Sequence, residues 1–221
     1  KAAIAPGHIL WLRADIGVTG TTNVTGWEDQ TTGNNDAASP GADPVKVNVG
    51  LNFNPTIQFT EASSQYMSIA GGGLFDSAQN NPTLWVYAVS STTSGTNETN
   101  IFAHDITGGT DLSFQAPTAG GNFSFNPGTG GALTNTWGGT ANNFNLWNAG
   151  FSSVGTTPSG QNITLYRDGF QLATDNDGTN FNANNGTMYI GRRVDGSNDM
   201  NGQIAELMVY TSVPTKQEQQ Q

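Results

Sequence analysis

Short runs of hydrophobic residues, separated by clusters of Gly, Asn, Asp, Ser and Pro, recur along the whole chain. Residues 84–89 (LWVYAV) are continuously apolar, which predicts a strand that is buried on both faces. Residues 146–151 alternate instead, and this spacing puts Trp147, Ala149 and Phe151 on one face of a strand. About a dozen such runs and no convincing helix favour an all-β sandwich or barrel.

The segments between the runs predict how neighbouring strands are joined. Asp168-Gly169 stands between two β-type runs, and this dipeptide is typical of a hairpin with a type I′ turn. Residues 57–59 and 66–69 flank a polar connection that suits a second hairpin. No repeat of 20–50 residues is visible, which disfavours propellers and solenoids. We therefore expect one domain over residues 1–213, followed by a polar tail at 214–221 that begins like a capped helix.

Composition and charge narrow the choice of partner. The 221 residues include 29 Gly, 25 Asn and 28 Thr but five Glu, a bias toward turns and strands over helices. Seven basic residues face 17 acidic ones, so the net charge of −10 predicts no nucleic-acid partner. The chain has no run of 18 apolar residues, which predicts no membrane insertion, and no cysteine for disulfides or thiolate metal sites.

The order of several motifs resembles that of bacterial laminin-G-like domains in the concanavalin A-like lectin/glucanase superfamily. The resemblance implies a jelly-roll sandwich of two curved antiparallel sheets. It also implies that the chain is part of a large, multidomain protein that is secreted or held at the bacterial surface. The motifs that carry the resemblance are residues 9–18 (ILWLRADIGV), 24–30 (VTGWEDQ), 31–37 (TTGNNDA), 165–169 (LYRDG), 189–192 (YIGR) and 202–210 (GQIAELMVY).

The resemblance predicts function less sharply than fold, because this fold carries both lectins and enzymes. Catalytic relatives have a Glu-x-Asp-x-x-Glu string, which this chain lacks, and relatives often have Asp where this chain has Ala205. We therefore expect a non-catalytic carbohydrate-binding or adhesion module, outside the cell, whose partner is a glycan or cell-surface polysaccharide. One alternative is a glycoside hydrolase or lyase with a pair such as Glu206 and Asp168; another is a structural spacer without a ligand.

Sugar-binding sandwiches use exposed aromatic rings against the apolar faces of sugars, with amides to hold the hydroxyls. Trp11, Trp85 and Trp147 lie in apolar runs and are predicted to be core residues. Trp137 lies instead in a loop rich in Gly and Asn, where it is either a sugar platform or a loop anchor. The predicted carbohydrate-binding residues are Trp137, Asn142, Asn143 and Asn184.

Calcium is the metal that the Asp-rich loops of this chain would take, as a structural ion. Asp105 and Asp111 bracket a Gly-containing loop, so their carboxylates are predicted to converge at one hairpin. Residues 175–178 and 195–199 are two further Asp-containing tips, although Asp and Asn also favour turns for local reasons. His104, beside Asp105, is either a ligand for a sugar or metal or a solvated strand end.

Overall fold

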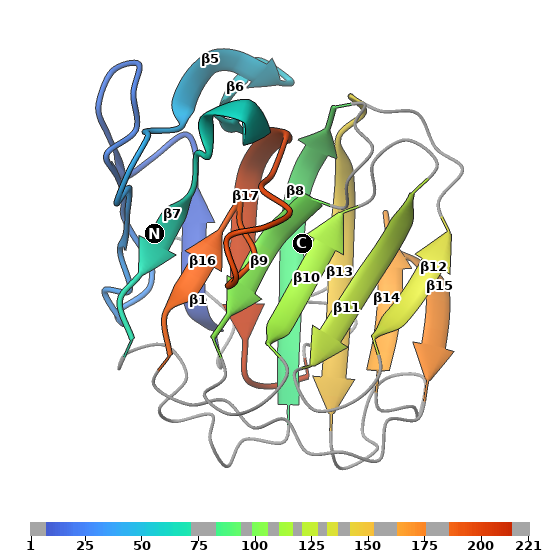
Figure 1. Ribbon diagram of the computed structural model, residues 1–221. Helices are drawn as coiled ribbons and strands as arrows, with labels where there is room; N and C mark the ends of the chain where they lie inside the picture. Colours follow the sequence, from blue (N-terminus) through green and yellow to red (C-terminus); the bar gives the residue numbers. More distant parts are fainter. Residues whose placement is uncertain are drawn as a thin grey trace.

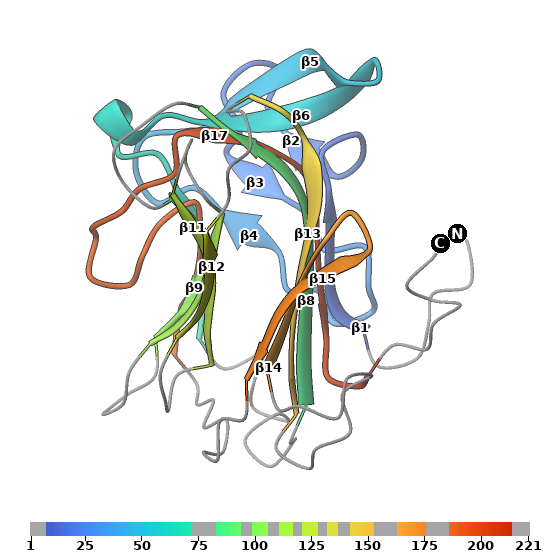
Figure 2. The same ribbon diagram turned by 90° about the vertical axis from the view of Figure 1, so that its right-hand side faces the viewer.

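The computed structural model describes residues 8–71, 83–93, 99–105, 111–116, 121–127, 132–136, 142–152, 163–175 and 186–213. In these residues, two antiparallel sheets pack face to face, as Figures 1 and 2 show. The helical structure among them is one 3-10 turn, η1 (Glu61–Ser63). The predicted all-β class and jelly-roll sandwich are confirmed.

The larger strands of the chain form sheet A, which lies at the back in Figure 1. Strand β1 also belongs to this sheet, because it pairs with β17. The members in spatial order are β15 (Phe170–Asp175), β14 (Ile163–Arg167), β13 (Asn145–Ser152), β8 (Thr83–Thr92), β17 (Gly202–Tyr210), β6 (Asn54–Phe59) and β5 (Val45–Leu51), with β1 (His8–Arg13) beside β17.

Sheet B lies in front in Figure 1 and is built from shorter strands. Its order is β12 (Leu133–Thr136), β11 (Asn122–Pro127), β10 (Leu112–Ala116), β9 (Thr99–His104), β16 (Met188–Ile190), β7 (Met67–Ile69), β4 (Ala37–Ala38), β3 (Gly26–Trp27) and β2 (Val18–Thr19). Neighbouring strands in space are often distant in sequence, as in other sandwiches with crossed connections.

The main core fills the space between the two sheets. Trp147, Ala149 and Phe151 are buried in it, as the alternation in β13 predicts. The rings of Phe123 and Trp147, from opposite sheets, have centroids 4.8 Å apart. Burying large rings between two facing sheets is the dominant stabilising contribution in a fold of this kind.

The β14–β15 hairpin has the predicted turn. Asp168 and Gly169 have φ angles of 49° and 80°, which are the two left-handed conformations that a type I′ turn requires. The second predicted hairpin is wrong. Strand β6 lies in sheet A and β7 lies in sheet B, so residues 60–66, including η1, cross from one sheet to the other. A polar connection of that length can join two strands of one hairpin or cross between the sheets. Which of the two it does depends on how its flanking strands pair with distant parts of the chain.

Strand β17 changes partner along one of its edges. Its first residues pair with β6 and its last residues pair with β1, while β8 runs along the other edge. The register against β8 shifts between Ile204 and Glu206, so Ala205 is the extra residue of a β-bulge. A bulge moves the following side chain to the opposite face of the sheet. Glu206 therefore points away from the core, whereas Ile204 points into it.

Candidate functional site

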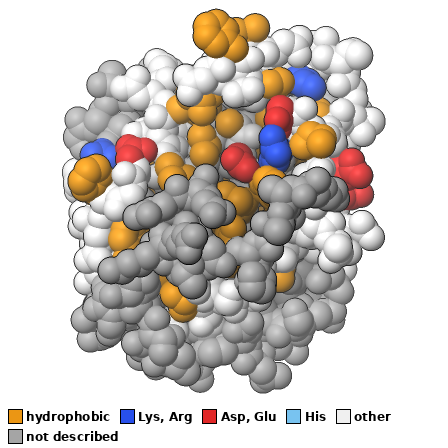
Figure 3. Space-filling view, turned by 180° about the vertical axis from the view of Figure 1, so that it is seen from behind, with side chains coloured by type: hydrophobic (Ala, Val, Ile, Leu, Met, Phe, Trp, Pro, Cys, Tyr) orange, Lys and Arg blue, Asp and Glu red, His pale blue; other side chains and the backbone are white. Residues whose placement is uncertain are grey.

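The outer face of sheet A, which Figure 3 shows, carries a second hydrophobic cluster that is built around the rings of Trp85, Tyr87 and Tyr210. Apolar side chains gather at its centre, with basic and acidic side chains beside them. Direct register pairs place the five residues Trp11, Met208, Tyr87, Asn148 and Tyr166 in one row across β1, β17, β8, β13 and β14. With strands about 4.8 Å apart, such a row extends for roughly 19 Å.

Six rings on this face contact one another in sequence, and we call them the aromatic belt. The centroid distances are 5.8 Å for Trp11–His8, 5.0 Å for His8–Tyr210 and 5.6 Å for Tyr210–Tyr87. The belt continues at 6.4 Å for Tyr87–Trp85 and 6.1 Å for Trp85–Tyr166. These separations are typical of stabilising ring pairs. Tyr87, Tyr210 and Trp85 are buried, so Trp11, His8 and Tyr166 are the rings that remain partly exposed.

Trp85 reaches this arrangement because β13 has a glycine opposite it. A Cβ atom at Gly150 would lie 2.5 Å from two carbon atoms of the Trp85 indole. The ring therefore packs against β13 at Gly150, in a place that only a glycine leaves open. Gly150 and Trp85 are direct partners in the register of β13 and β8.

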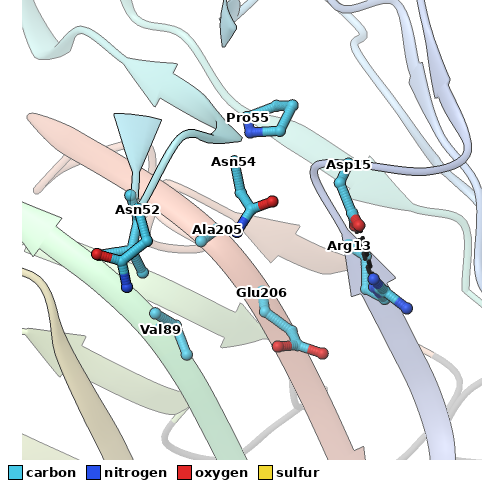
Figure 4. Close-up of a pocket in the computed structure, with 9 residues that line it drawn as sticks. Arg13, Asp15, Asn52, Asn54, Pro55, Val89, Ala205 and Glu206 are labelled. Carbon is cyan, nitrogen blue, oxygen red and sulfur yellow. Dashed lines mark hydrogen bonds and ion pairs between the residues drawn. The ribbon is translucent and has the colours of Figure 1, made fainter. Parts of the chain in front are cut away.

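Beside the exposed end of the belt, a cavity of about 230 Å³ opens on the same face. Figure 4 shows its polar side chains, which come from β1 and the turn that follows it, from β17 and from the tip of the β5–β6 hairpin. We call it the hairpin cavity. Its lining residues are Arg13, Asp15, Leu51, Asn52, Asn54, Pro55, Val89, Ala205 and Glu206. The cavity exists where β17 exchanges β6 for β1, and the bulge at Ala205 aims Glu206 toward it.

Two interactions hold the charged groups of the hairpin cavity in place. Arg13 Nε and Nη2 donate to the two carboxylate oxygens of Asp15 at 3.0 and 2.6 Å, a two-point pair with fixed geometry. Trp11 Nε1 donates to Glu206 Oε1 at 2.5 Å. The Arg13 guanidinium also lies 5.3 Å from the centroid of the Trp11 ring. Trp11 thus joins the aromatic belt to the cavity, and its ring is positioned by both charged partners.

The cavity carries more negative than positive charge. Its lining includes one basic side chain, Arg13, and two acidic ones, Asp15 and Glu206, for a formal charge of −1. In the belt, burial lowers the pKa of His8 more strongly than the charge of Asp29 raises it. Burial raises the pKa of Tyr166. Both rings therefore favour their neutral forms near pH 7, and the partly exposed rings of the belt form an uncharged group beside a polar cavity.

The structure does not assemble the four predicted sugar-binding residues into one described site. Trp137 and Asn184 lie outside the described residues. Asn142 is exposed, has a φ of 70°, and donates its backbone N–H to Thr92 O at 2.7 Å. Asn143 is exposed and accepts a hydrogen bond from Asn145 Nδ2. Both asparagines lie just before β13, and their role in binding stays a prediction.

The predicted calcium ligands, Asp105 and Asp111, directly follow β9 and directly precede β10 in one hairpin. His104 pairs with Leu112, and Asp105 and Asp111 stand just beyond this pair, but residues 106–110 between them lie outside the described residues. Within the described part of the chain, no three His, Asp or Glu side chains are close enough to share a metal ion. The calcium site stays a prediction. His104 is not a solvated strand end, since it is 1% exposed, and its role as a ligand stays a prediction.

Among the residues that line the hairpin cavity, Glu206 alone is a candidate functional residue from the sequence, as one of a carboxylate pair with Asp168. The apolar run around Trp11 predicts a core position, which is wrong: Trp11 is half-buried on the outer face of sheet A, because Leu10 and Leu12 take the inward positions. Trp85 is buried as expected, yet in a second cluster outside the main core. The sequence of β1 does contain a signal for the outward position of Trp11, because Leu10 and Leu12 alternate with it. The bulge at Ala205, which aims Glu206, has no comparable signal in the sequence.

Comparison with known proteins identifies the class to which this architecture belongs. The family model for the concanavalin A-like lectin/glucanases superfamily matches residues 61–218. This match covers more than half of the chain, so the chain belongs to that superfamily. No curated protein matches it in sequence.

Solved structures with the same fold are distant in sequence. A botulinum neurotoxin type C, whose cell entry depends on two ganglioside molecules, superposes with a TM-score of 0.66 at 11% identity, over 96% of this chain and 49% of that one. The binding domain of botulinum neurotoxin DC in complex with SialylT gives 0.67 at 9%, over 96% and 50%. Trypanosoma rangeli sialidase gives 0.62 at 14%, over 97% and 32%. The chain thus spans a half or less of these proteins, and the likeness shows the fold.

Among the helices of the described residues, none has the length and apolar character needed to cross a bilayer.

Proposed function

We propose that this chain is a carbohydrate-binding module whose ligand lies in the hairpin cavity and against Trp11. The proposal rests on one observation, that an aromatic ring lies directly beside charged and polar side chains. A partly exposed indole stands beside the Arg13–Asp15 pair, Glu206 and the amide of Asn54, all on one face. A sugar presents an apolar ring face and a rim of hydroxyls, and this arrangement offers a partner to each.

The side chains of the site are also held in place before any ligand binds. Trp11 is held by Glu206, and Arg13 is held by Asp15, so binding would order few further side chains. Positioned polar groups lower the entropic cost of binding. Carboxylate and guanidinium groups with unused lone pairs or N–H groups can still accept from and donate to sugar hydroxyls. Two toxins with the same fold support a glycan as the ligand class: botulinum neurotoxin type C, whose cell entry depends on two ganglioside molecules, and the neurotoxin DC binding domain in complex with SialylT.

We also propose where such a module acts. A module that recognises a glycan would serve adhesion or substrate targeting in a secreted or surface protein. The low share of charged residues, 11%, and the net charge of −10 suit an exposed, soluble surface. Membership in the superfamily supports a lectin-like role in a longer chain, and calcium at the β9–β10 hairpin would be structural.

Binding of the purified chain to a glycan panel, followed by one matched pair of variants, tests the proposal. Asn54 lines the cavity and is exposed, so Asn54→Ala should fold normally and bind about tenfold more weakly. Asn48, an exposed asparagine on the neighbouring strand β5, lies outside the cavity lining, and Asn48→Ala should bind like the wild type. Equal binding by all three proteins would place the ligand elsewhere, and no binding to any glycan would refute the function.

A second candidate function is glycoside hydrolysis, because two carboxylates face the same cavity. Asp15 and Glu206 both line it, and hydrolysis of a glycosidic bond uses a pair of carboxyl groups. Asp168, which the sequence suggested as a partner of Glu206, is instead engaged at the β14–β15 turn, where its Oδ1 accepts from Leu146 N–H at 2.9 Å. Release of reducing ends that disappears in both Asp15→Asn and Glu206→Gln would support hydrolysis.

A further inference from the structure

The tip of the β5–β6 hairpin has a conformation that its sequence does not favour. Leu51 pairs with Asn54, so Asn52 and Phe53 form a two-residue loop. Their φ angles are 49° and 66°, and both residues are therefore left-handed, as in a type I′ turn. Asn tolerates this conformation, but the second position strongly favours Gly, and an aromatic residue there is rare. The fold would be served better by the pair Asn-Gly.

The side chain of Phe53 also gains nothing from the interior of the protein. It is 89% exposed, more than any other large hydrophobic residue among those described. The ring therefore adds an apolar surface to water at a backbone position that strains the residue. Two local costs at one position call for a reason outside folding, because a polar residue or Gly at the tip would avoid both.

The position of Phe53 supplies that reason. Its two chain neighbours, Asn52 and Asn54, line the hairpin cavity, so Phe53 stands at the rim of the cavity and points into solvent. Figure 2 shows the β5–β6 hairpin reaching outward on the side of sheet A. The cavity holds about 230 Å³, whereas pockets that enclose a whole small ligand are about 300–1,000 Å³. The cavity is therefore smaller than a pocket that encloses a whole ligand, and an oligosaccharide bound in it would extend past the rim.

We propose that Phe53 is a ligand-contacting residue: its ring packs on the part of an oligosaccharide that extends out of the hairpin cavity. The site then has an inner subsite for one sugar residue and an outer one formed by the hairpin tip. This proposal rests on the proposed function and adds the ligand class, an oligosaccharide rather than a single sugar. Stacking on a ring uses the apolar C–H face of a sugar and makes no hydrogen bonds to its hydroxyl groups, so the outer subsite selects more for length than for the identity of the sugar.

The test compares Phe53→Gly, Phe53→Trp and the wild type, using cellohexaose, xylohexaose, chitohexaose and mannohexaose and the corresponding monosaccharides. Val49→Thr is the control, because Val49 is also an exposed apolar residue of this hairpin but lies outside the cavity lining. Phe53→Gly should bind the preferred hexasaccharide about five- to tenfold more weakly. Its midpoint of thermal unfolding should stay unchanged or rise by up to about 4 °C, because glycine adopts the turn without strain.

The outcomes distinguish a failure of the Phe53 proposal from a failure of the proposed function. A loss that is confined to the hexasaccharide and restored by Phe53→Trp supports the proposal, since a purely structural defect would not depend on ligand length. Equal affinity of Phe53→Gly and the wild type overturns it while glycan binding stands, and directs attention to a protein partner for the hairpin tip. If the wild type binds none of these sugars, nor any member of a wider glycan panel, the proposed function fails and this proposal fails with it.

Discussion

Gly150 lies directly beneath the Trp85 indole, and replacing it with alanine should destabilise the protein. The new Cβ atom would stand 2.5 Å from Cε2 and Cζ2 of the ring and 2.7 Å from Cδ2. Carbon atoms in contact are about 3.5–4.0 Å apart, so the indole must move by about 1 Å. Trp85 is fully buried and contacts Tyr87 and Tyr166, which leaves it little room to move. Overpacking of this kind costs about 1–3 kcal/mol, or roughly 3–10 °C in the midpoint of thermal unfolding.

The assay is thermal unfolding followed by circular dichroism, with Gly41→Ala as the matched control. A Cβ atom at Gly41 meets only Tyr66 Cε1, at the ordinary distance of 3.9 Å, so this variant should be as stable as the wild type or slightly more so. The near-ultraviolet spectrum should change in Gly150→Ala alone, because the tryptophan environment changes. If the two variants melt within about 1 °C of each other, Trp85 does not lie on β13 as described, and the aromatic belt is arranged differently.

Two further predictions concern ionisation and charge. Because burial lowers the pKa of His8 below its ordinary value of 6.5, the unfolded chain binds this proton more readily than the folded one. The stability that neutral His8 contributes should be complete above about pH 6.5 and decline as the pH falls below it; urea unfolding from about pH 7.5 to pH 5 should show a flatter profile for His8→Gln. The cavity charge of −1 predicts that neutral hexasaccharides bind better than uronic-acid or sialylated ones. In parallel binding titrations, Glu206→Gln should reduce the difference in affinity between neutral and acidic hexasaccharides. An unchanged difference would contradict the charge argument.

The strands and their inward faces could be predicted because they depend on local periodicity. The alternation around Trp147 and the Asp168-Gly169 turn both appear in the structure as expected. Trp11 shows the limit of this reasoning. Its neighbours in sequence are leucines, and a run of apolar residues does not by itself say which member faces outward.

The site could not be predicted because it depends on contacts between distant parts of the chain. Trp11 and Glu206, which share a hydrogen bond, are 195 residues apart. Glu206 faces outward only because Ala205 forms a bulge, and bulges depend on how two strands pair rather than on either strand alone. The β5–β6 hairpin is a similar case. Its tip is Asn-Phe rather than Asn-Gly, so the type I′ turn there carries no sequence signal.

The most direct test of the central claim is a map of the ligand's position in solution. Titration of the ¹⁵N-labelled chain with the hexasaccharide it binds best should shift the Trp11 indole N–H signal most, because that group bonds to Glu206 at the mouth of the cavity. The backbone amides of Arg13 and Asn54 should shift with it. Shifts centred on Asn142 and Asn143, with the Trp11 indole signal unmoved, would contradict the account and return the binding site to the loop before β13.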